Sequence, residues 1–140
     1  MTYVLDSSVA LKWFLTESDS PKATRLREDA RSGIHDLMAP DFFPVEMTHA
    51  VTRAERQGRI TPAEGVAFVA DLLTELPALH PALPLLARAY AISSANRQGV
   101  YDCVYVALAE REGCELVTAD AKLIATLGAR FPFLTDLATL

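Results

Sequence analysis

The chain has 140 residues, of which 51% are hydrophobic and 22% are charged, the size and composition of one globular domain with a large buried core. No apolar run approaches the roughly 20 residues needed to span a bilayer, and no basic segment followed by a hydrophobic run opens the chain, so we expect a cytoplasmic protein without membrane contact. The net charge of −5 argues against nonspecific coating of nucleic acid, although it leaves room for a local basic groove.

The first third of the chain predicts two strands and two helices. Thr2–Leu5 indicates a short buried strand, and the apolar side chains spaced over residues 9–15 indicate a helix directly after it. A second helix is expected over residues 21–31, with Ser20 as its cap and a proline in its first turn. Residues 37–39 then favour a short strand that a proline closes.

The middle of the chain predicts two helices followed by a loop. One helix is expected over residues 41–57, with a proline in its first turn. The next covers residues 62–75, where Thr61 and Glu64 form a capping box, the clearest boundary signal in the chain. Prolines interrupt residues 77–84, so we expect a loop there with a brief extended segment.

The last third predicts two further helices before the chain returns to strands. The helices are expected over residues 85–97 and 101–113, the second of them strongly apolar. A strand over residues 115–117 and a short helix over residues 120–127 follow. Residues 133–134 favour a last strand at the edge of a sheet.

This alternation of strands and helices predicts an α/β fold with a central, mainly parallel sheet covered on both faces. Right-handed crossovers place the strand-to-helix junctions along one carboxyl edge of such a sheet. Asp6 and Asp120 each follow a predicted strand, so this edge is where they would meet. We expect residues 1–140 to form a single domain.

Four carboxylates lie in or beside apolar stretches where a lone acid would be poorly solvated: Asp6, Glu46, Asp102 and Asp120. If the fold gathers them, their repulsion of roughly 4 kcal/mol per close pair at an effective dielectric near 20 requires a cation. A set of oxygen ligands points to Mg²⁺ or Mn²⁺. The aspartates have a competing explanation as helix caps, whereas Glu46, inside a helical turn among apolar residues, is poorly explained by capping.

The segments that carry these acids resemble a known family. The sequences VLDSS, PVEMTHA, YDCVYVALAE and LVTADAKL together resemble the PIN domain, specifically the VapC-type ribonuclease toxins of bacterial toxin–antitoxin pairs. The resemblance covers nearly the whole chain and implies a three-layer α/β/α fold with a strand order like 3-2-1-4-5. It also implies an acidic metal site formed by Asp6, Glu46, Asp102 and Asp120, with polar support from Ser7 and Thr118.

The resemblance further implies an activity and partners. It predicts a Mg²⁺- or Mn²⁺-dependent endoribonuclease that hydrolyses RNA phosphodiester bonds, is inhibited by a cognate antitoxin and forms a homodimer. Carboxylate-held Mg²⁺ suits that reaction because it polarises the phosphate and lowers the pKa of a bound water. We expect Asp6 and Asp102 to be the principal ligands, with Glu46 and Asp120 acting through water or orienting the nucleophile. A PIN-like binding or scaffold module without turnover is the alternative.

Basic residues recur along and just beyond the third predicted helix. Arg53, Arg56 and Arg59 are spaced every three residues, and they form either a solvated helix face or a set of phosphate contacts. Lys12 and Lys122 are further candidates for phosphate contacts because they lie near the segments that carry the acids.

The cysteines and histidines form no motif of their own. Cys103 and Cys114 make no CxxC or Cys/His cluster, so zinc sites and disulfide frameworks are poorly supported and buried free thiols are expected. The three histidines pair with no serine or cysteine in a nucleophile motif, which argues against metal-free, histidine-based RNA cleavage.

Overall fold

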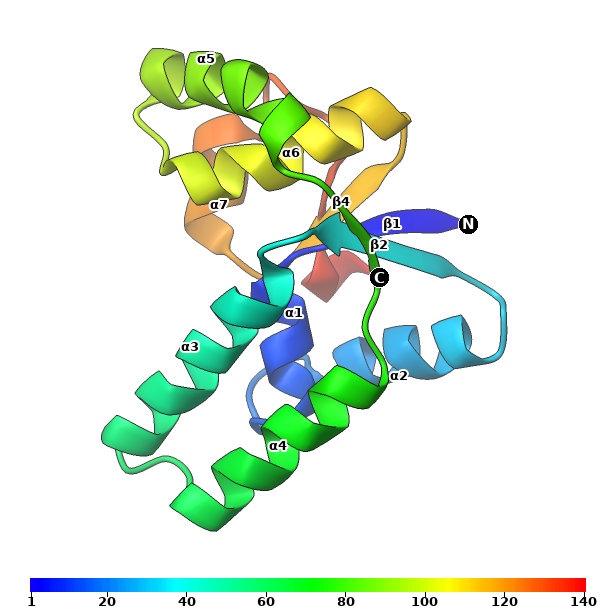
Figure 1. Ribbon diagram of the computed structural model, residues 1–140. Coiled ribbons are helices and arrows are strands. Elements are labelled where there is room, and N and C mark those ends of the chain that lie inside the picture. Colours follow the sequence, from blue (N-terminus) through cyan, green and yellow to red (C-terminus); the bar gives the residue numbers. More distant parts are fainter.

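A five-stranded parallel sheet lies at the centre of the computed structural model, which describes residues 1–140 (Figure 1). The strands follow the order β3-β2-β1-β4-β5, and each neighbouring pair is parallel. Both the parallel sheet and the strand order agree with the prediction. The strands are β1 (Thr2–Leu5), β2 (Asp36–Pro40), β3 (Ala78–His80), β4 (Glu115–Thr118) and β5 (Leu134–Asp136).

Helices cover both faces of the sheet and give the molecule three layers (Figure 1). α5, α6 and α7 lie on one face, and α1 to α4 lie on the other. None of the helices combines the length and the apolar character that crossing a bilayer would require. The helices are α1 (Ser7–Ala10), α2 (Ser20–Arg31), α3 (Phe43–Arg56), α4 (Pro62–Thr74), α5 (Leu86–Asn96), α6 (Val100–Glu112) and α7 (Ala121–Leu127).

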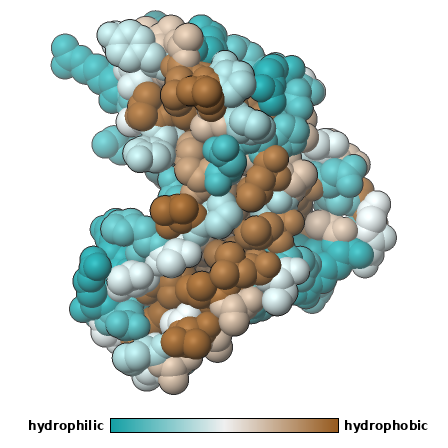
Figure 2. Space-filling view, viewed as in Figure 1, coloured by the Kyte–Doolittle hydropathy of each residue, from teal (hydrophilic) through white to brown (hydrophobic).

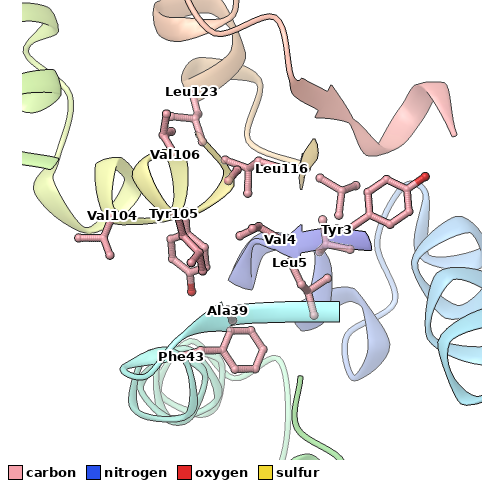
Figure 3. Close-up of a cluster of buried hydrophobic side chains, with 14 of the residues drawn as sticks. Tyr3, Val4, Leu5, Ala39, Phe43, Val104, Tyr105, Val106, Leu116 and Leu123 are labelled. Atoms are coloured by element: carbon pink, nitrogen blue, oxygen red, sulfur yellow. The ribbon is translucent and has the colours of Figure 1, made fainter. Parts of the chain in front are cut away.

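The main core surrounds the central strand β1, with α6 packed on one face of the sheet and residues of α2 and α3 on the other (Figure 3). Val4 and Leu5 of the central strand are fully buried, as is Tyr105 of α6. Every side chain of α6 from Cys103 to Ala109 is buried, which explains why this helix is apolar on all sides rather than along one stripe. The helix therefore brings its first turn against the carboxyl edge of the sheet.

α3 and α4 form a hairpin that extends away from the sheet (Figure 1). It has a small core of its own, made by Leu15, Val51, Ala54 and Ile60. Thr61 and Glu64 form the predicted capping box, with both reciprocal hydrogen bonds present. The turn between the two helices is therefore well defined.

The structure corrects two local predictions near the amino terminus. Ser20 is the first residue of α2 rather than its cap, and Asp19, with a left-handed φ of 62°, precedes the helix. The Ser20 hydroxyl instead accepts a hydrogen bond from the Glu17 N–H, which closes the preceding turn. The helix predicted over residues 9–15 divides into α1 and a 3₁₀ turn at Leu11–Trp13.

Both cysteines are free thiols, as predicted. Cys103 is fully buried, whereas Cys114 is only partly buried. Burial raises the pKa of Cys103 to about 11, and it raises that of Cys114 as well. Neither thiol is therefore in a reactive, ionised form at neutral pH.

Candidate active site

The four acids come from separate elements that meet at the carboxyl edge of the sheet. Asp6 follows β1 directly, and Asp120 follows β4 by two residues. Glu46 lies in the first turn of α3, and Asp102 lies in the first turn of α6. Figure 2 shows a notch in the surface between the α3–α4 hairpin and the α5–α6 pair, beside the starts of α1, α3 and α7.

Asp6 is the most deeply buried of these acids, with 4% of its surface exposed. Its backbone is extended, and its side chain makes no capping hydrogen bond to α1, so capping does not explain it. The pKa of Asp6 is raised to about 6, chiefly by burial; hydrogen bonds from Ser8 and Thr118 lower it, and the nearby charges of Asp102 and Glu46 add to the rise. At neutral pH Asp6 is therefore ionised, and burying this charged carboxylate lowers the free energy of unfolding.

Two hydroxyl groups hold the Asp6 carboxylate in place. Ser8 Oγ and Thr118 Oγ1 each donate to Asp6 Oδ2, at 2.5 and 2.8 Å. The same hydroxyls accept hydrogen bonds from the backbone of the loop after β4: Ala119 N–H donates to Ser8 and Asp120 N–H donates to Thr118. This network joins the end of β1 to the end of β4.

Glu46 is fixed by a tyrosine from the opposite layer of the fold. Tyr105 Oη donates a hydrogen bond of 2.7 Å to Glu46 Oε1, and the Tyr105 ring packs edge-on against Phe42. Burial and the charges of Glu46 and Asp6 raise the pKa of Tyr105 far above its usual value, so it remains a donor. One oxygen of Glu46 is thereby oriented from α6.

Asp102 is held by a glutamine one turn before it. Gln98 Nε2 donates a hydrogen bond of 2.8 Å to Asp102 Oδ2, and Gln98 itself is buried. Burial raises the pKa of Asp102; the Gln98 hydrogen bond opposes this, Asp120 raises the pKa, and Lys122 lowers it. The Asp102 side chain makes no cap to α6.

Asp120 is the one acid of the four that caps a helix with its side chain. Its Oδ1 accepts hydrogen bonds from the N–H groups of Lys122 and Leu123, at 3.0 and 3.2 Å, at the start of α7. The capping interpretation therefore holds for Asp120. Its second carboxylate oxygen, Oδ2, makes no hydrogen bond and remains free for another ligand.

The acids lie close enough to repel one another, yet no cation is paired with them. Asp6 interacts electrostatically with Asp102 and Glu46, and Asp102 interacts with Asp120. None of the ten ion pairs in the molecule includes any of the four. No three of the acids stand close enough to enclose a metal ion by themselves. This donor set fits Mg²⁺, which is held through one or two carboxylates and keeps several of its waters.

The supporting residues differ in part from those predicted. Thr118, one of the two residues named as polar support, donates to the Asp6 carboxylate, and the second hydrogen bond to that carboxylate comes from Ser8, the neighbour of Ser7. Ser7 lies on the Glu46 side of the site, where both residues line the same groove. Sequence reasoning missed Ser8 and Tyr105, as well as Gln98; the first two lie within the segments VLDSS and YDCVYVALAE that had been singled out.

Comparison with known proteins identifies a family and several relatives. The model of the PIN domain matches residues 3–127. Ribonuclease VapC12 of Mycobacterium tuberculosis is 35% identical over 126 residues, which cover 89% of this chain and 92% of that protein. Ribonuclease VapC3 of Pyrobaculum aerophilum is 30% identical over 125 residues, which cover 88% of this chain and 92% of that protein.

A solved structure shares the fold at low sequence identity. PAE2754 from Pyrobaculum aerophilum superposes with a TM-score of 0.70 at 22% identity, covering 99% of this chain and 94% of that one. At this level of identity the likeness shows the three-layer architecture alone.

Proposed function

The chain belongs to the PIN domain family, and we propose that it is a Mg²⁺- or Mn²⁺-dependent endoribonuclease, the toxin of a toxin–antitoxin pair. The observation that carries the proposal is Asp6, a buried carboxylate beside Glu46 and Asp102 with no cationic side chain paired to it. The relatives at 35% and 30% identity are both named ribonucleases, which supports RNA as the substrate.

In this proposal Asp6 and Asp102 hold the cation directly, and Glu46 and Asp120 act through water or orient the attacking water. A bound Mg²⁺ or Mn²⁺ supplies positive charge for the phosphate oxygens and lowers the pKa of a water. Ser8 and Thr118 keep the Asp6 carboxylate from rotating, so its charge is already in position when substrate arrives. Tyr105 and Gln98 do the same for Glu46 and Asp102.

The experiment is a fluorogenic RNA cleavage assay with Mg²⁺, with Mn²⁺ and with EDTA. Asp6→Asn and Asp102→Asn remove a charge with almost no change in volume, and we expect each to lower turnover by about a hundredfold or more. Asp36→Asn is the matched control because Asp36 is exposed at the amino end of β2, the opposite edge of the sheet. Folded Asp6→Asn protein with wild-type turnover would exclude this site, and a wild type inert with both metals would favour the scaffold alternative.

The proposal includes two protein partners. A cognate antitoxin would inhibit by placing an arginine in the acidic site, since a guanidinium satisfies two carboxylates where the cation otherwise sits. The structure of VapBC2 from Rickettsia felis bound to a DNA fragment from their promoter has the same fold, with a TM-score of 0.65 at 14% identity over 97% of this chain. The second partner is another copy of this chain, in a homodimer.

A further inference from the structure

A groove leads away from the acidic site along α3, and nothing in the proposed chemistry uses it. The groove has a volume of about 360 Å³ and lies between α3 and the segment formed by α1 and its 3₁₀ turn. Ser7 and Glu46 line the end next to the acids, while Gln57 and Arg59 line the far end. The groove is therefore continuous with the candidate active site.

One face of α3 forms a wall of this groove. Glu46, His49, Arg53 and Gln57 follow one another at spacings of three or four residues, which places them on the same side of a helix. At a rise of 1.5 Å per residue, His49 lies about 4.5 Å and Arg53 about 10.5 Å beyond Glu46 along the helix axis. His49 and Arg53 could thus donate hydrogen bonds to successive backbone phosphates at increasing distance from Glu46.

The basic side chains on this wall form no ion pair within the protein. Arg53 is exposed and forms none of the ten ion pairs, and the same is true of His49. Arg59, by contrast, donates to Glu17 at 2.8 Å, a carboxylate that also pairs with Lys12. Arg53 is therefore the free guanidinium in the groove.

The inner side of the groove is apolar. Leu11 and Leu15 come from the 3₁₀ turn and its end, and Ala50 and Ala54 come from α3. An apolar surface beside a free guanidinium matches what a single-stranded nucleic acid offers, because its unpaired base stacks or packs while its phosphate is bound. The volume is in the range that holds one compact ligand, about one nucleotide unit rather than a duplex.

We propose that this groove binds the single-stranded RNA segment on one side of the cleaved bond, with Arg53 contacting a backbone phosphate and the surface around Ala50 contacting a base. The inference rests on the proposed ribonuclease function and adds a binding residue to it. It also revises the stripe of three arginines predicted from sequence: Arg53 and Arg59 line the groove, whereas Arg56 does not.

Arg56 is the matched control for Arg53, because it carries the same charge on the same helix but lies outside the groove. Both arginines are exposed, lie in the last turns of α3 and form no ion pair, but only Arg53 lines the groove. The two variants are Arg53→Gln and Arg56→Gln. Ala50→Leu, which fills the groove without changing charge, is the third.

The cleaved bond is first mapped in a single-stranded RNA oligonucleotide, which is then extended by one to four nucleotides on its 5′ or its 3′ side. We expect kcat/KM to rise with extension on one side only. Arg53→Gln should raise KM about tenfold with kcat nearly unchanged, and should reduce the slope of log kcat/KM against log salt by about 0.7. Ala50→Leu should abolish the gain from extension, and Arg56→Gln should change none of these quantities.

Equal KM values and equal salt slopes for the wild type, Arg53→Gln and Arg56→Gln would overturn the inference while the ribonuclease function stands. If the wild type does not cleave RNA, fluorescence anisotropy with a labelled ten-nucleotide RNA in EDTA measures whether the groove binds RNA. Weaker binding by Arg53→Gln than by Arg56→Gln supports the groove, and equal binding rejects it. Unchanged RNA binding combined with weakened antitoxin inhibition in Arg53→Gln would assign the groove to the protein partner and reject RNA as its occupant.

Discussion

Asp6 is a carboxylate held by two hydroxyl groups and by no cationic side chain. The hydroxyls stabilise its ionised form, but its burial and the neighbouring acids oppose ionisation more strongly. Because its pKa of about 6 in the folded chain exceeds the usual value of 3.8, the metal-free protein binds a proton at this position more tightly than the unfolded chain does. Asp6 therefore links stability to pH.

We expect Asp6 to stabilise the metal-free fold at low pH and to lose that contribution as pH rises. The contribution is complete below about pH 4 and disappears as pH passes through 6, a total of roughly 3 kcal/mol for a shift of this size. Denaturant unfolding in EDTA between pH 4 and 7.5 measures it. Asp6→Asn should fall less steeply across this window than the wild type, and parallel curves for the two proteins would contradict the assignment.

The residues that surround the acids were harder to predict from the sequence than the acids themselves. An acid inside an apolar stretch can be recognised from the local sequence, because a charged group among apolar neighbours would be poorly solvated. A donor such as Tyr105, 59 positions away from Glu46, cannot be recognised from the local sequence, because only the folded chain brings the two residues together. Ser8 and Ser7 are adjacent and chemically identical, so choosing between them requires the backbone direction at the start of α1.

At the scale of elements, three aspartates at helix starts have different roles. Asp120 caps α7 through its side chain, while Asp6 and Asp102 do not cap the helices they precede or begin. A cap contributes about 1 kcal/mol, whereas an uncapped acid beside other acids is destabilising without a cation. Stability measurements can therefore separate the two roles.

In metal-free buffer, Asp120→Ala removes a cap of about 1 kcal/mol, partly offset by relief of its repulsion with Asp102, and should lower the free energy of unfolding. Asp102→Asn relieves repulsion without removing a cap, so it should be neutral or stabilising. Mg²⁺ should then raise the melting temperature of the wild type more than that of Asp102→Asn, since the ion binds the folded wild type preferentially. Thermal melts in EDTA and across a Mg²⁺ titration give both results. Two results together would mean that no shared metal site exists: Asp102→Asn is less stable than the wild type in both buffers, and the melting temperature of the wild type does not change with Mg²⁺ or Mn²⁺.

Element boundaries were predictable where a local signal sets them. The Thr61 and Glu64 pair marked the start of α4 because both reciprocal hydrogen bonds form within one turn. Ser20 was wrongly taken as a cap because Asp19 adopts a left-handed conformation that depends on the turn before it. The brief extended segment expected among the prolines is β3, at the edge of the sheet.

At the scale of the whole molecule, the alternation of strands and helices was enough to predict the parallel sheet and its acid-bearing edge. The strand order came from the family resemblance. What the pattern did not predict is the outward extension of the α3–α4 hairpin, since its small core includes Leu15, from the segment after α1, and Ile60, from the turn between the two helices. Figure 2 shows apolar surface over α4 on this extension.

We expect the proposed homodimer to form through this outer face of α4. Val66 and Leu73 lie seven residues apart on α4, with 73% and 55% of their surfaces exposed, so they share one solvent-facing side. Size-exclusion chromatography with light scattering should give twice the chain mass of 15.3 kDa for the wild type and a single chain for Val66→Glu. Ile34→Glu, at an exposed apolar residue just after α2, is the control. A dimer that survives Val66→Glu would place the interface elsewhere.

The hydroxyl network around Asp6 has a consequence for how the protein is made. Thr118 and Asp6 are 112 positions apart in the sequence, and β4 pairs directly with β1. The first strand therefore cannot form this pairing until nearly the whole chain has been synthesised. Until residue 120 has left the ribosome, Asp6 has neither Thr118 to hold it nor the loop that binds Ser8. The acidic site is therefore completed only when nearly the whole chain has been translated, and no earlier nascent segment contains it.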